Sequence, residues 1–226
     1  DEQERQHGDR SRERTDFECR RGVLLLEVAR ERVLLVSLSG SAEIQQVRPQ
    51  EDPPRNSRLA VRFHDAGGLA ITDARAGTWL RLLADENALP DLGSFGPDAL
   101  NGELDPEAWR ASLQGRRAQI KGLLLDATLV AGIGPSVADE ILFQARIRPD
   151  RKAADLSDEE IDRLREMVSR TLDKAVRCQA RPEQLPKSFL GRTLAEGSEL
   201  CPKCEASLDK RKIQGRTTYF CPTCQQ

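Results

Sequence analysis

The chain has 226 residues, of which 38% are hydrophobic and 32% are charged, and its formal net charge is −2. This composition is typical of a globular protein with modest cores, and no stretch approaches the roughly 20 apolar residues of a membrane-spanning helix. The net charge argues against a uniformly basic nucleic-acid-binding protein. Residues 177–226 nevertheless carry nine basic and five acidic side chains, and such a local surplus fits either a phosphate-binding face or a solvated surface.

The N-terminal part of the chain predicts a polar tail followed by a β-domain. Residues 1–18 are almost wholly charged and polar, so we expect a disordered tail there. Residues 19–100 carry short apolar runs separated by turn-forming stretches. The expected strands are 23–28, 32–38, 59–63 and 69–72. We predict an antiparallel β-sandwich, followed by a linker over 89–101.

Helical periodicity replaces this pattern over residues 101–195. We predict helices over 106–113, 117–126, 135–145 and 157–177. Asp105 is the expected N-cap of the first helix, and the third begins at a proline, as helices tolerate. Ser157 and Glu160 have the spacing of a capping box at the start of the fourth. Residues 178–200 have low helix propensity.

Four cysteines near the C-terminus form two Cys-x-x-Cys pairs separated by sixteen residues. The four are Cys201, Cys204, Cys221 and Cys224. Each pair offers two thiolates from one tight turn, and two facing turns make the closed tetrahedral cage of a structural zinc site. We therefore predict one structural Zn²⁺ in a zinc-finger domain over 196–226, with a β-hairpin between the turns. Two disulfides or four free thiols are the alternatives.

A second motif lies between two expected helices, where Gly132 and Gly134 precede Pro135. Two glycines let the backbone turn tightly and leave bare N–H groups beside a helix N-terminus, which attracts a phosphate. A Gly-x-Gly before a helix is a weak signal by itself, because an ordinary turn between helices has the same sequence.

These motifs together resemble a known family. The runs 120–126, 130–134 and 138–143 resemble the helix-two-turn-helix module of the formamidopyrimidine-DNA glycosylase / endonuclease VIII family. Residues 215–225, with the ending Cys-Pro-Thr-Cys-Gln, resemble its C-terminal zinc finger. Weaker resemblances occur around residues 20–22, 38–40 and 72–80.

The resemblance implies a two-lobed α+β clamp in which an N-terminal β-sandwich faces a helix-two-turn-helix module with a zinc-finger β-hairpin. Double-stranded DNA with a lesion or an abasic site would lie between the lobes. The implied DNA contacts are Lys121, Gly132 and Gly134 for flanking phosphates, Arg216 for the phosphate of the extruded nucleotide, and Leu38 and Arg75 for the space left by that nucleotide.

The sequence departs from the family pattern at sites of chemistry. Catalysis in the family begins at an N-terminal proline followed by glutamate, whereas this chain begins Asp1-Glu2, so no catalytic residue is assigned. We expect these 226 residues to have little or no lyase activity. The asparagine expected after Gly134 is Pro135, which removes a backbone N–H and an amide.

The leading hypothesis is a DNA-binding protein of base-excision repair, from a DNA glycosylase and abasic-site lyase family, that acts on oxidised bases or abasic sites. A catalytically inactive DNA-binding member of the family is the alternative. A zinc ribbon that binds proteins and not DNA is a third reading. We expect a monomer without a membrane partner, in the cytoplasm, and associated with the nucleoid if bacterial.

Overall fold

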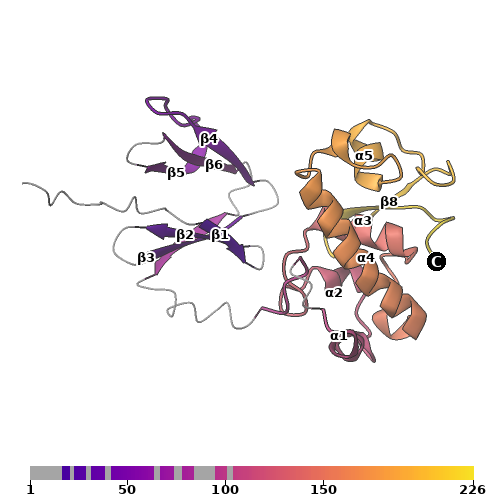
Figure 1. Ribbon diagram of the computed structural model, residues 1–226. Coiled ribbons are helices and arrows are strands. Elements are labelled where there is room, and N and C mark those ends of the chain that lie inside the picture. Colours follow the sequence, from indigo (N-terminus) through magenta and orange to yellow (C-terminus); the bar gives the residue numbers. More distant parts are fainter. Residues whose placement is uncertain are drawn as a thin grey trace, which may run out of the picture.

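The computed structural model describes residues 17–20, 23–28, 32–38, 42–63, 67–73, 78–83, 95–100 and 104–226. The expected N-terminal tail lies outside these residues except for its last two, and Arg75 also lies outside them. Figure 1 shows strands β1–β6 on one side of the molecule and all the labelled helices on the other. Within the described ranges, no helix is both long enough and apolar enough to cross a membrane.

The N-terminal lobe contains two antiparallel sheets. The first has the order β1 (Phe17–Arg20), β2 (Val23–Val28), β3 (Arg32–Ser37), β7 (Trp79–Leu83), and the second has the order β4 (Ala42–Val47), β6 (Gly67–Asp73), β5 (Ser57–Phe63). Val36 of β3 and Ile71 of β6 are buried in one cluster, to which β5 adds Leu59 and Val61. The two sheets therefore pack face to face, which confirms the predicted sandwich.

Three of these strands were not predicted. β1 begins at Phe17, two residues inside the expected tail. β4 carries only Ile44 and Val47 as large apolar residues, and four of its six residues are exposed. β7 lies in the segment compared with the family's wedge loop, although it pairs along β3 from Ser37↔Trp79 to Val33↔Leu83.

The C-terminal lobe contains five α-helices among its described residues. They are α1 (Pro106–Leu113), α2 (Ile120–Leu124), α3 (Pro135–Ala145), α4 (Asp158–Arg177) and α5 (Leu190–Ala195), with 3₁₀ turns η3 (Ala153–Asp155) and η4 (Pro182–Gln184). The predicted bounds of α1 and α3 are confirmed, α2 is shorter than 117–126, and α5 was missed. Helices α1 to α4 share one buried core, in which Trp109 Nε1 donates to Ile161 O at 3.3 Å.

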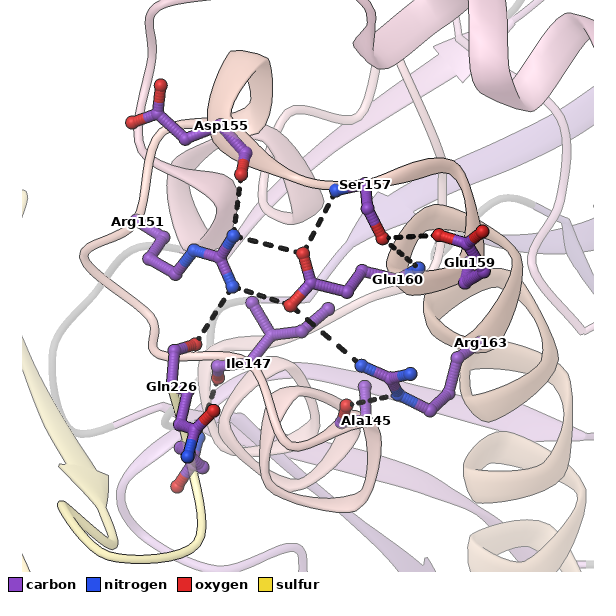
Figure 2. Close-up of polar contacts among 10 residues, drawn as sticks. Ala145, Ile147, Arg151, Asp155, Ser157, Glu159, Glu160, Arg163 and Gln226 are labelled. Atoms are coloured by element: carbon purple, nitrogen blue, oxygen red, sulfur yellow. Dashed lines mark hydrogen bonds and ion pairs between the residues drawn. The ribbon is translucent and has the colours of Figure 1, made fainter.

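The start of α4 is held by the predicted capping box and by a wider network. Glu160 N donates to Ser157 Oγ at 3.3 Å, and Ser157 N donates back to Glu160 Oε2 at 3.0 Å. Figure 2 shows Glu160 between this cap and Arg151, whose guanidinium also reaches the backbone oxygens of Asp155 and Gln226. The last residue of the chain is thereby tied to the first turn of α4.

The predicted hairpin is formed by β8 (Asp209–Ile213) and β9 (Arg216–Phe220). Its two turn residues, Gln214 and Gly215, have φ values of 48° and 76°. Two positive φ values are the signature of the type I′ turn, whose twist matches that of a hairpin. Gly122 of α2 lies beneath this turn, because a Cβ added there would meet Gln214 Nε2 at 2.0 Å. The hairpin tip therefore rests on α2.

Residues 95–100 belong to the helical lobe rather than to a free linker. Ala131 N donates to Pro97 O at 3.0 Å, and Ala99 N donates to Ala131 O at 3.2 Å. Ala99 is fully buried in the helical core. Residues 95–100 are hydrogen-bonded to Ala131, next to the glycine-containing bend. The helical lobe therefore includes residues N-terminal to 101, where we expected the helical domain to begin.

Candidate functional site

The four predicted metal ligands come together. The Sγ atoms of Cys201, Cys204, Cys221 and Cys224 all lie within 4.8 Å of one another. Their closest cross-pairs are 3.5 Å for Cys204 and Cys221 and 3.8 Å for Cys201 and Cys224. A disulfide requires about 2 Å between sulfurs, whereas a tetrahedron with metal–sulfur bonds of about 2.3 Å has edges of about 3.8 Å. The spacing fits one tetrahedral thiolate-bound ion.

Backbone hydrogen bonds shape the two turns around these sulfurs. Lys203 N lies 3.4 Å from Cys201 Sγ, and Cys224 N lies 3.3 Å from Cys221 Sγ. An N–H directed at sulfur stabilises a thiolate more than a neutral thiol. Phe143 and Leu190 pack against the cysteines from α3 and α5, so the cluster is built into the helical lobe.

The thiols would not all ionise without a cation. A hydrogen bond from the backbone of Ala206, together with the nearby thiol of Cys224, lowers the pKa of Cys204 to about 7. Burial raises the pKa of Cys201, and it raises the pKa of Cys224 to about 12. A bound divalent ion offsets this burial because it deprotonates the thiols that coordinate it.

Gln225 connects the second cysteine turn to the helices. Its side chain is 1% exposed. Gln225 Oε1 accepts from Cys221 N at 2.8 Å, and Nε2 donates to Ile147 O at 2.8 Å. The sequence analysis assigned Gln225 no role beyond its place in the Cys-Pro-x-Cys-Gln ending. Its burial and its two hydrogen bonds show why a glutamine suits that position.

The glycine bend presents an uncapped helix N-terminus. Gly132 has a φ of 91°, a conformation that L side chains rarely adopt, and Gly134 is the N-cap of α3. Within the described parts of the chain, no side chain caps this helix. Pro135 has no N–H, so Ser136 and Val137 supply the first donors of α3, and Ser136 is exposed. A helix N-terminus without a cap is a site for an anion.

Lys121 lies differently from the expectation. Its side chain is 1% exposed, and Nζ lies 2.6 Å from Asp139 Oδ1 and 2.6 Å from Thr218 Oγ1. Burial raises the pKa of the Asp139 carboxyl, and the Lys121 ammonium opposes that rise. In this conformation the ammonium is enclosed between α2, α3 and β9, and the phosphate contact expected of Lys121 stays a prediction. The sequence predicted that Lys121 lies on a helix, which is α2, but it did not reveal the ion pair with Asp139 of α3.

Arg216 is placed as the hairpin predicted. It is the first residue of β9, directly after the turn, and it is exposed. Among the described residues, no ion pair or hydrogen bond engages its guanidinium. An exposed guanidinium on a hairpin anchored by four cysteines is available to bind a phosphate with two parallel hydrogen bonds.

The β-sandwich contributes a basic turn that the sequence reading missed. Arg55, Asn56, Ser57 and Arg58 line a hollow of about 310 Å³ together with the buried Asp73. Asp73 Oδ2 accepts from Thr78 N at 2.6 Å. Arg55 in the turn and Arg58 at the start of β5, three residues apart, were the available signal. Leu38 is half-buried against the Val36 and Ile71 cluster, and its role as a wedge stays a prediction.

Known proteins share these features. Residues 95–185 match the model described as the formamidopyrimidine-DNA glycosylase H2TH domain. The formamidopyrimidine-DNA glycosylase of Symbiobacterium thermophilum is 33% identical over 217 residues, covering 91% of this chain and 71% of that protein. That of Heliobacterium modesticaldum is 33% identical over 222 residues, covering 92% and 80%.

Solved structures agree with the sequence comparison. A complex between the Lactococcus lactis Fpg and DNA containing an abasic site has a TM-score of 0.79 at 27% identity, covering 93% of this chain and 81% of that one. A β-sandwich joined to a helix-two-turn-helix module and a four-cysteine hairpin defines one class of protein. The chain belongs to the formamidopyrimidine-DNA glycosylase family, as the sequence resemblance predicted.

Proposed function

We propose that the protein acts in base-excision repair by holding double-stranded DNA around an oxidised base or an abasic site. Structural neighbours were solved with DNA containing an abasic site, a Fapy-dG or a carbocyclic 8-oxo-G. The observation that carries the proposal in this chain is the pairing of two anion-binding groups on one lobe. They are the uncapped N-terminus of α3 and the exposed Arg216.

The two groups divide the contacts in a simple way. Backbone N–H donors at the start of α3 suit one phosphate, because they point along the helix axis and add the partial positive charge of the helix end. Arg216 suits a second phosphate through its planar guanidinium. Contacts of this kind position the duplex and do not read its sequence. They fit a protein that selects a damaged nucleotide rather than a base sequence.

We propose that the metal is Zn²⁺, held by Cys201, Cys204, Cys221 and Cys224 in a structural site. Four sulfur ligands in a closed tetrahedron leave no open position for a reacting molecule. When bound, the ion supplies folding energy to the hairpin and no step of the repair chemistry. Its effect on DNA is therefore exerted through the position of Arg216.

The experiment is a binding titration with a labelled duplex that carries a tetrahydrofuran abasic-site analogue, repeated over a range of salt concentrations. Arg216→Gln should weaken binding about tenfold or more. The slope of log K against log salt should become shallower by the amount that corresponds to about one phosphate contact. Arg170→Gln is the matched control, since Arg170 is exposed on α4 and pairs with Glu166 at 2.6 Å. Equal affinities for all three proteins would overturn the proposal.

A further inference from the structure

The groups around Lys121 form a continuous buried chain from α3 to the backbone of Arg216. The ammonium of Lys121 forms an ion pair with Asp139 Oδ1 on one side and donates to Thr218 Oγ1 on the other, at 2.6 Å each. Thr218 Oγ1 then donates to Arg216 O at 3.2 Å. Asp139 Oδ2 also accepts from Tyr219 N, at 3.4 Å. We call Lys121, Asp139 and Thr218 the lysine cluster.

The lysine cluster is costly for a purely structural feature. Lys121 and Thr218 are fully buried and Asp139 is 7% exposed. Removing a charged pair from water costs several kcal/mol for each ion, and well-packed apolar residues of the same shape often stabilise a fold as well or better. A buried ion pair gains most from its directionality, because it fixes which groups face one another.

The geometry shows what the cluster fixes. Side chains alternate along a strand, so Arg216 and Thr218 leave β9 on the same face. Thr218 is held by Lys121 through its hydroxyl, and that hydroxyl holds the carbonyl of Arg216. The turn preceding Arg216 rests on Gly122, the residue after Lys121. The backbone that carries the guanidinium is thus fixed to α2 and α3.

We propose that the lysine cluster is a positioning device that aims Arg216 at a DNA phosphate, and that Lys121 itself does not contact DNA. This inference rests on the proposed function, since it concerns how Arg216 binds the duplex. Arg216 is the residue that touches the phosphate, and the three members of the cluster act through it.

Asp139→Asn separates this inference from direct contact, because the two predict opposite changes. If Lys121 bound a phosphate directly, removing its acidic partner would free the ammonium and leave affinity for abasic-site DNA equal or higher. The positioning role predicts an affinity about tenfold lower, close to the effect of Arg216→Gln. Thr218→Val should act in the same direction, and Thr217→Val, which changes the adjacent exposed residue, should have no effect.

A purely structural role is tested by combining substitutions. If the cluster acts through Arg216, then Thr218→Val should weaken binding in the native background and add nothing in an Arg216→Gln background. Independent effects that multiply would overturn the inference. Hydrogen exchange at the Tyr219 amide should also accelerate in Asp139→Asn, since that N–H loses a charged acceptor.

A paired variant guards against loss of the fold. A single substitution such as Asp139→Asn leaves a buried charge without its partner, which destabilises the fold. Lys121→Met with Asp139→Leu removes both charges at nearly constant shape and should remain folded by circular dichroism, yet bind DNA about tenfold more weakly. Native affinity in this double variant would overturn this inference and leave the proposed function unaffected. A native protein without affinity for the abasic-site duplex would overturn the proposed function, and the inference with it.

Discussion

Gln225→Leu should destabilise the helical lobe strongly although it changes a residue next to the end of the chain. The amide of Gln225 bridges Cys221 N and Ile147 O, both at 2.8 Å, in a site that is 1% exposed. Leucine has a similar volume but satisfies neither group. The backbone N–H of the cysteine turn and the carbonyl at the end of α3 would then be buried without partners.

The expected loss follows from those two groups. A buried polar group without its partner costs about 1–3 kcal/mol, so two cost about 2–6 kcal/mol. The apolar side chain recovers about 1–2 kcal/mol through burial. The net loss in the free energy of unfolding therefore lies between about 0 and about 5 kcal/mol, with a central value of about 2.5 kcal/mol. At a urea m-value of about 2 kcal/mol/M, the central value lowers the unfolding midpoint by about 1 M.

Urea unfolding of the zinc-loaded protein, followed by circular dichroism at 222 nm, measures this loss. All the described helices lie in the C-terminal lobe, so the signal reports that lobe. Gln226→Leu is the matched control, because Gln226 is exposed and contributes through its backbone. Gln226 O accepts from Arg148 N at 3.0 Å, and that bond survives the substitution. Equal midpoints for the two variants would refute the reasoning.

Three further substitutions have graded outcomes. Gly132→Ala should lower the free energy of unfolding in urea by about 1–2 kcal/mol, because a φ of 91° is strained for alanine. A steric clash does not contribute, since the nearest atom lies 4.0 Å from the added carbon. Gly134→Ala is the control and should be neutral, because Gly134 has a φ of −89° and open space around it. Glu160→Gln should cost about 1–2 kcal/mol at pH 7 through the capping box and Arg151. Burial opposes but does not cancel the effect of Arg151, so the folded pKa of Glu160 lies below its ordinary 4.5. Its stabilisation is complete above that value and is lost as the pH falls through the folded pKa, so native and variant stabilities should converge in acid. A gap between native and variant stabilities that stayed equally large in acid would contradict this assignment.

Local signals in the sequence predicted much of the fold. Pro106 after Asp105, Pro135 after Gly134 and the Ser157–Glu160 pair fix helix starts through contacts within four residues. The four cysteines are also a local signal, since each turn carries its own two thiols, and the site then joins the two turns across sixteen residues.

The missed elements depend on distant residues. α5 is short, and its first turn is held from α3, where Glu140 accepts from Gly191 N at 2.8 Å. β4 is mostly exposed and exists because it pairs along β6. The burial of Lys121 was not predicted because its partners, Asp139 and Thr218, lie 18 and 97 residues further along the chain. Pairings of that kind are set by the tertiary fold and leave no periodic trace in the sequence.

The central claim is that a metal-bound hairpin presents Arg216 to the sugar-phosphate backbone. The most direct measurement is the affinity for an abasic-site duplex before chelation, after chelation, and after zinc is restored. We predict that affinity is lost with the ion and returns with it, while Arg216→Gln stays weak throughout. Unchanged affinity in the chelated protein, or a preparation that contains no metal, would contradict the claim.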